Sequence, residues 1–125
     1  DILKAMKKIL IVEDDIFIRD IAEEKLSAAG YEVYKTADGN SVIQKMQEVK
    51  PDLVLLDLLL PNKHGYVVLE ELRADERFTE TPVLVFSNEN GPDVEKKAAD
   101  LGALYFFKAM TGTGELTKKV QEILG

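Results

Sequence analysis

Four short apolar runs, separated by amphipathic stretches, are the feature of this sequence that most restricts its fold. They are residues 9–12 (ILIV), 53–56 (LVLL), 83–86 (VLVF) and 104–107 (LYFF). Each run is apolar at consecutive positions, which is typical of parallel strands that helices cover on both faces. A fifth, more alternating segment at 33–36 is expected to form an edge strand.

Helical periodicity fills the stretches between these runs. Apolar side chains recur three and four residues apart within 18–26, 42–49, 69–72, 94–101 and 116–124. Gly30 and Gly102 follow two of these stretches and Pro51 follows a third, as expected at helix ends. Each strand is therefore followed by a helix. Five such units predict an α/β fold with a doubly wound, five-stranded parallel sheet.

Composition narrows the class of protein. The 125 residues suit one domain, and 46% hydrophobic with 31% charged residues is ordinary for a globular chain. The absence of cysteine and the single histidine exclude disulfides, thiol nucleophiles and Cys- or His-rich metal sites. The net charge of −7 predicts no direct contact with nucleic acid and none with a membrane surface. We expect a cytoplasmic protein.

Polar residues follow the apolar runs where the predicted strands end. Residues 13–15 (EDD) follow the first run, Asp57 the second, Ser87 the third and Lys108 the fourth. Ligands of open α/β sheets bind outside the carboxyl ends of the strands, so these residues form a candidate site. Each has an ordinary explanation as well: Asp14 or Asp15 could cap a helix, Ser87 could form a loop, and Lys108 could be a solvated strand end. Their joint occurrence is more specific than any single member.

Asp57 is the hardest of these residues to explain structurally, because it interrupts the apolar run 53–60, where an unpaired charge is costly. Carboxylates about 5 Å apart repel by about 3 kcal/mol per pair at an effective dielectric near 20. A hard divalent cation, Mg²⁺ or Mn²⁺, would offset that repulsion. An ammonium and a hydroxyl beside such a cation suit a phosphoryl group, with a carboxylate as its nucleophile.

The chain resembles the receiver domain of two-component response regulators over residues 7–124. The matching motifs are 8–15 (KILIVEDD), 51–57 (PDLVLLD), 58–61 (LLLP) with Gly65, 81–87 (TPVLVFS) and 102–108 (GALYFFK). The resemblance implies a flavodoxin-like sheet in strand order 2-1-3-4-5 with five helices. It assigns residues 7–125 to the receiver domain. Residues 1–6 would be the remnant of an added sequence or the end of an upstream segment.

The resemblance also implies roles for individual residues. Asp57 would be the phosphoacceptor and Asp14 a direct Mg²⁺ ligand. Glu13 would hold the metal mainly through water, and the backbone carbonyl of Leu59 would complete the protein ligands. No organic cofactor is implied.

Three further residues would respond to the phosphoryl group. Ser87 would be the switch hydroxyl, Lys108 the phosphate-binding ammonium and Tyr105 the switch aromatic, turning from an exposed to an inward position. The phosphoryl donor would be a sensor histidine kinase or a phosphotransfer protein, and the altered surface would contact a downstream protein target. The chain would not be an enzyme beyond its own phosphorylation and dephosphorylation.

Two alternatives stay open at this point. The first is an α/β enzyme or a flavin or nucleotide binder. Dinucleotide binding is disfavoured because the turn 13–17 contains no glycine, and a DxD phosphohydrolase because 57–59 lacks the second acid. A degenerate receiver, used only as a constitutive interaction domain, is favoured by Asn88 and by Ala109, where many receivers carry a cis-proline. His64 also replaces a frequent Asp. Retention of the strand-end residues argues against degeneration.

Overall fold

The computed structural model describes residues 6–125, so most of the segment 1–6 lies outside the described residues. Five parallel strands form one sheet in the order β2-β1-β3-β4-β5. The strands are β1 Lys8–Val12, β2 Glu32–Thr36, β3 Leu53–Asp57, β4 Val83–Ser87 and β5 Leu104–Phe107. The predicted flavodoxin-like order is confirmed, and β2 is the expected edge strand.

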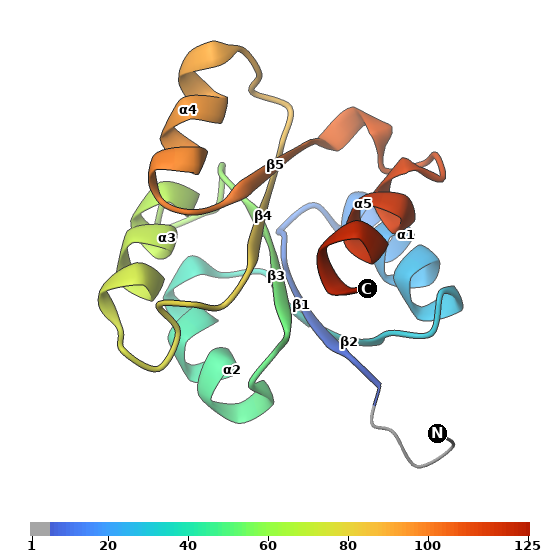
Figure 1. The fold of residues 1–125 in the computed structure, drawn as a ribbon, viewed down its shortest axis with the longest axis horizontal. Helices are drawn as coiled ribbons and strands as arrows, with labels where there is room; N and C mark the ends of the chain where they lie inside the picture. Colours follow the sequence, from blue (N-terminus) through green and yellow to red (C-terminus); the bar gives the residue numbers. More distant parts are fainter. Residues whose placement is uncertain (1–5) are drawn as a thin grey trace.

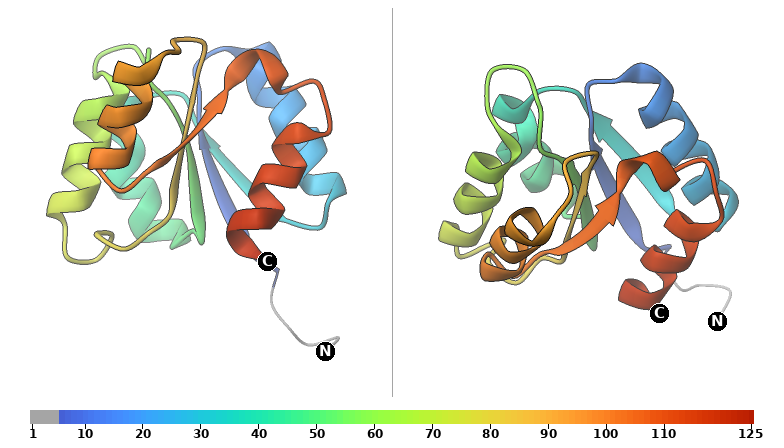
Figure 2. Two further views of the ribbon diagram at one scale, coloured as in Figure 1. Left: turned by 45° about the horizontal axis from the view of Figure 1, so that its top comes forward. Right: turned by 90° about the horizontal axis from the view of Figure 1, so that it is seen from above.

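Five helices cover the sheet. They are α1 Ile16–Ala28, α2 Val42–Val49, α3 Gly65–Ala74, α4 Pro92–Asp100 and α5 Glu115–Leu124, with short 3₁₀ turns at Gly39–Ser41 and Lys108–Met110. Helices α1 and α5 lie on one face, and α2, α3 and α4 lie on the other (Figures 1 and 2). This is the doubly wound arrangement that the sequence predicts. Among residues 6–125, no helix combines the length and apolar character needed to cross a membrane.

The strands divide their side chains between two apolar cores. Ile9 and Ile11 of β1 pack beneath α1 and α5, whereas Leu10 and Val12 pack against the three helices of the opposite face. All residues of β3 and β4 are buried. The consecutive apolar positions in the sequence therefore reflect burial on both faces of the sheet.

The register of the strands brings their carboxyl ends to one edge. Asp57 at the end of β3 is aligned with Phe86 of β4, and Ser87 at the end of β4 is aligned with Phe107 of β5. Val12, the last residue of β1, is aligned with Leu56. The polar residues that end or follow these strands consequently share one rim.

Candidate functional site

Three carboxylates converge at this rim. One oxygen from each of Glu13, Asp14 and Asp57 lies within 4.8 Å of the others. Glu13 is 0% and Asp57 3% exposed, whereas Asp14 is exposed at the mouth of the cluster. Clustered oxygen donors beside open solvent are the kind of ligand set that a hard divalent cation takes.

Lys108 reaches into the cluster from the end of β5. Its Nζ lies 2.5 Å from Glu13 Oε1 and 3.3 Å from Asp57 Oδ1, and its side chain is only 12% exposed. Lys108 is therefore not a solvated strand end. One ammonium facing three carboxylates leaves the rim with excess negative charge, which a cation would offset.

Burial and the contacts between Glu13 and Lys108 shift the pKa values of the two groups. Burial raises the pKa of Glu13 to about 7, and the Asp57 charge adds to this effect, while Lys108 opposes it. Burial by itself lowers the pKa of Lys108, but its contacts with Glu13 and Asp57 outweigh burial and raise the pKa. Lys108 therefore stays charged, and Glu13 is the group whose ionisation is costly.

The structure separates the two aspartates that follow Glu13. Asp15 is the N-cap of α1, because its Oδ1 accepts hydrogen bonds from the backbone N–H of Phe17 at 2.9 Å and of Ile18 at 3.3 Å. Its own N–H donates to Glu13 Oε2 at 3.1 Å. Asp15 is thus occupied with the helix, and Asp14 is the acid that faces the cluster.

The loop after β3 lies close to Asp57. Leu59 N–H donates to Asp57 Oδ1 at 3.4 Å, while the Leu59 side chain is exposed. Gly65 N–H donates to Leu58 O at 2.7 Å, and a Cβ at position 65 would lie 2.3 Å from Asp57 O. Only glycine permits this approach, so Gly65 holds the start of α3 against the end of β3.

His64, which replaces a frequent Asp of the family, has a structural role. It is exposed, yet it is the N-cap of α3, because its Nδ1 accepts a hydrogen bond from Tyr66 N–H at 3.1 Å. The two rings stack with centroids 5.4 Å apart. Helix α3 is therefore capped by an imidazole nitrogen, at a position where many receivers carry Asp.

Ser87 and Tyr105 both contact the loop that follows β4. Ser87 is buried, and its Oγ accepts a hydrogen bond from Glu89 N–H at 3.0 Å. The Tyr105 hydroxyl donates to Ser87 O at 3.1 Å and to Glu89 O. Tyr105 is half-buried, and these hydrogen bonds hold its side chain inward against the loop; its rotation as a switch stays a prediction.

The structure also shows where the residues that depart from the receiver pattern lie. Asn88 and Ala109 are exposed, and none of the peptide bonds described, including Lys108–Ala109, is cis. The 3₁₀ turn Lys108–Met110 follows β5 directly, and Thr111 Oγ1 donates to Lys108 O at 2.5 Å. A trans peptide at this point is thus compatible with Lys108 reaching the cluster.

Arg73 is an organising residue that the sequence reasoning missed. Its guanidinium donates to five backbone carbonyls and pairs with none of the carboxylates in the part of the chain that the structure describes. The acceptors are Leu101 O at 2.7 Å, Thr81 O at 2.8 Å, Gly102 O at 3.2 Å, and Phe78 O and Thr79 O at 3.3 Å. The signal was an arginine directly after the apolar positions 69–72 of the third predicted helix.

Comparisons of the sequence and of the structure both match this chain to response regulators. The family model for the response regulator receiver domain matches residues 9–121. The chemotaxis protein CheY4 of Vibrio cholerae is 30% identical with a TM-score of 0.87, covering 95% of this chain and 99% of CheY4. A putative response regulator from Chloroflexus aurantiacus is 29% identical with a TM-score of 0.88, covering 96% and 98%.

A curated relative is longer than this chain. The DNA-binding dual master transcriptional regulator RpaA of Synechocystis is 33% identical over 119 residues, which are 95% of this chain but 49% of RpaA. The chain spans about half the length of the curated relatives it matches. Because RpaA is described as DNA-binding, the comparisons do not support the expectation that no nucleic acid is contacted.

Proposed function

Since this chain belongs to the family of response regulator receiver domains, we propose that residues 7–125 accept a phosphoryl group on Asp57. The donor is the phosphohistidine of a sensor histidine kinase or of a phosphotransfer protein. The observation that carries the proposal is the buried Asp57 carboxylate, 3.3 Å from Lys108 Nζ and within the acidic cluster. The domain acts in two-component signalling, and its own phosphorylation is the only chemistry proposed.

In the proposed reaction a carboxylate oxygen of Asp57 attacks the phosphorus atom. The new P–O bond forms as the P–N bond of the donor breaks, and the released imidazole nitrogen takes a proton from solvent. Lys108 neutralises charge on the transferred oxygens, and the Ser87 hydroxyl, which now only accepts, donates to one of them.

The acidic cluster fits a divalent cation. Glu13 Oε1 is buried, and its ion pair with Lys108 Nζ at 2.5 Å leaves the other carboxylates of the cluster with little positive charge. Asp14, Asp57 and the carbonyl of Leu59 would hold Mg²⁺ or Mn²⁺ directly, with Glu13 acting mainly through water. The metal, when bound, supplies positive charge to the carboxylates and the phosphoryl oxygens. Asp14→Ala should weaken Mg²⁺ binding strongly and Asp15→Ala much less, as measured by calorimetric titration.

Ser87 and Tyr105 provide a route from Asp57 to the surface. If the Ser87 hydroxyl turns toward the phosphoryl group, Glu89 N–H loses its acceptor, while Tyr105 still binds the Glu89 carbonyl. The loop before α4 must then rearrange. The surface formed by α4, β5 and α5 would change, and a downstream protein target would read that change. The shift is limited by the difference in affinity of the phosphoryl group for the two states.

Acetyl phosphate with Mg²⁺ tests the proposal. The chain should gain the mass of one phosphoryl group, and the modification should be labile to hydroxylamine. Asp57→Asn should abolish the gain, whereas Asp20→Asn, at an exposed acid of α1, should not. Equal modification of the Asp57→Asn variant would refute the nucleophile. No modification and no Mg²⁺-dependent binding of beryllofluoride would instead favour the constitutive interaction domain.

A further inference from the structure

A cavity lies at the opposite end of the sheet from Asp57. It opens between α2 and the loop joining α3 to β4, and its volume is about 440 Å³, within the range of about 300–1,000 Å³ typical of small-molecule sites. The lining residues are Gln47, Lys50, Pro51, Arg77, Phe78 and Thr81. None of the six is acidic, although the chain carries a net charge of −7.

Arg77 is held in place at one side of this cavity. Its Nε and Nη2 donate to the two oxygens of Asp75 at 3.0 Å and 2.7 Å, and its guanidinium lies over the Phe78 ring, 5.1 Å from the centroid. The Asp75 carboxylate occupies one edge of the guanidinium. Nη1 and the outer hydrogen of Nη2 are left for a second acceptor.

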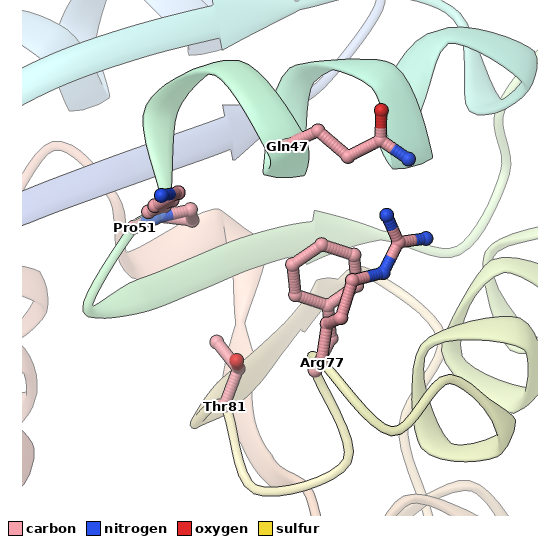
Figure 3. A pocket seen from close by; sticks show the side chains of 6 residues that line it. Gln47, Pro51, Arg77 and Thr81 are labelled. Atoms are coloured by element: carbon pink, nitrogen blue, oxygen red, sulfur yellow. The ribbon is translucent and has the colours of Figure 1, made fainter.

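Gln47 marks where that second acceptor lies. In Figure 3 the amide of Gln47 extends from α2 and meets the guanidinium of Arg77, with Pro51 on the other side of the cavity. After a half-turn of the amide from the orientation drawn, its oxygen accepts from Arg77 Nη1 at 2.8 Å and from Nη2 at 3.2 Å. A carboxylate oxygen would satisfy the same two donors and carry the charge that the amide lacks.

Lys50 adds a second cation to the rim. It ends α2 in the left-handed conformation, with φ of 53° and ψ of 61°, a position at which glycine is the less strained residue. A lysine is nevertheless present, directly before Pro51. Among the residues that the structure describes, Lys50 Nζ has no carboxylate within ion-pair distance, in contrast to Lys45 of the same helix, which pairs with Glu48.

The far wall of the cavity is fixed independently of any ligand. The carbonyls of Phe78, Thr79 and Thr81 are all bound by Arg73, which also binds the turn before β5. This anchoring keeps the loop from collapsing onto Pro51, so the cavity is preformed. Preformed sites bind at a lower conformational cost than sites that must be assembled.

From these contacts we infer that the cavity binds a small organic anion, with its carboxylate on Arg77 and Lys50 and a flat apolar ring against Phe78 and Pro51. The carboxylate replaces the Gln47 oxygen at Arg77. A planar ring suits the space between Phe78 and Pro51, which line the cavity together. This inference does not depend on phosphorylation of Asp57.

The experiment uses 2-naphthoate as the probe and amide NMR of the full chain at low ionic strength. We expect saturable shifts centred on residues 47–51 and 77–81. Gln47→Glu should weaken binding at least about tenfold, because the new carboxylate occupies Arg77. Gln121→Glu, which makes the same charge change on exposed α5, should leave binding unchanged.

Lys50→Gly keeps the test independent of folding, since glycine suits the left-handed backbone at that position. It should weaken 2-naphthoate binding about fivefold, the effect of losing one partly exposed charge pair. The neutral analogue 2-naphthylmethanol should bind at least about fivefold more weakly than 2-naphthoate. Shifts centred elsewhere, equal binding of the neutral analogue, or parental affinity in both Gln47→Glu and Lys50→Gly would overturn the inference.

Discussion

Two partly buried cations stand at opposite ends of the same sheet, and their surroundings differ. Lys108, beyond the carboxyl end of β5, contacts two carboxylates, Glu13 and Asp57, at the edge of a cluster with excess negative charge. Arg73, on the last turn of α3, faces five neutral backbone carbonyls. Burial lowers the pKa of Arg73, whereas the carboxylates raise that of Lys108.

The surroundings of Arg73 suit a structural role, whereas those of Lys108 suit the binding of a ligand. At the Arg73 end, each carbonyl acceptor is neutral and the hydrogen bonding is self-contained, so nothing further is required there. At the Lys108 end, buried acids face one another with too little positive charge, which destabilises the folded state in the absence of a bound cation. The first arrangement holds two loops together, and the second has a charge imbalance that suits a divalent cation.

The largest loss of stability should come from replacing Arg73. Arg73→Met leaves carbonyls of two loops without donors, and we expect a loss of about 3–5 kcal/mol in the free energy of unfolding. Arg73→Lys should recover only part of it, because one ammonium cannot reach all of these acceptors. Urea unfolding measures both. A loss below about 1 kcal/mol in Arg73→Met would contradict the structural role.

At the acidic cluster, the burial of Glu13 should make the free energy of unfolding depend on pH. The folded-state pKa of Glu13, about 7, lies above its ordinary value of 4.5. The folded state therefore binds this proton more tightly than the unfolded state. The resulting stabilisation is complete below about pH 4.5 and is lost as the pH rises through about 7, a change on the order of 3 kcal/mol.

Glu13→Gln isolates this contribution, because glutamine does not titrate while the other acids are retained. Unfolding free energies of both proteins should be compared between pH 4.5 and 8 in EDTA. The parent should lose stability relative to Glu13→Gln across that interval. Parallel profiles would show that Glu13 ionises freely in the fold.

Replacing Lys108 tests whether the two ends of the sheet are independent. Lys108→Met should cost about 2 kcal/mol without metal, since it leaves Glu13 and Asp57 unpaired. The same change should tighten Mg²⁺ binding several-fold, because the ammonium no longer competes for these oxygens. Arg73→Met should leave Mg²⁺ affinity unaltered. Calorimetric titration of the two variants decides whether the ends are independent; equal shifts in both would show that they are coupled.

Much of this comparison could be predicted from the sequence. The runs 9–12 and 53–56 were sufficient to predict buried parallel strands, because burial on both faces leaves no polar alternation. Asp57 stood out because it ends such a run. Parallel strands align their carboxyl ends, so the meeting of Glu13, Asp57 and Lys108 followed from topology.

The remaining features depend on backbone geometry and distant loops. The choice of Asp15 over Asp14 as the cap is set by the extended backbone of Asp15, with φ of −72° and ψ of 112°. The inward position of Tyr105 depends on two carbonyls of another loop. The acceptors of Arg73 come from turns up to 29 residues away, and no local pattern indicates them.

The smallest predicted effect concerns His64, which stabilises the Lys108 end without taking part in its charge imbalance. Its Nδ1 accepts one of the free N–H groups at the start of α3, that of Tyr66. His64→Ala should therefore lower the free energy of unfolding by about 1 kcal/mol. His64→Asp should recover that loss, because a carboxylate caps the same N–H and interacts favourably with the helix dipole.

Lys63→Ala is the matched control, since Lys63 lies in the same loop and forms only a partly exposed ion pair with Glu71. It should cost less than about 0.5 kcal/mol. Urea unfolding at neutral pH distinguishes the variants. If His64→Ala costs no more than Lys63→Ala, or if His64→Asp is less stable than His64→Ala, the imidazole is not the cap. Stability at this rim would then rest on the close packing of Gly65 against β3.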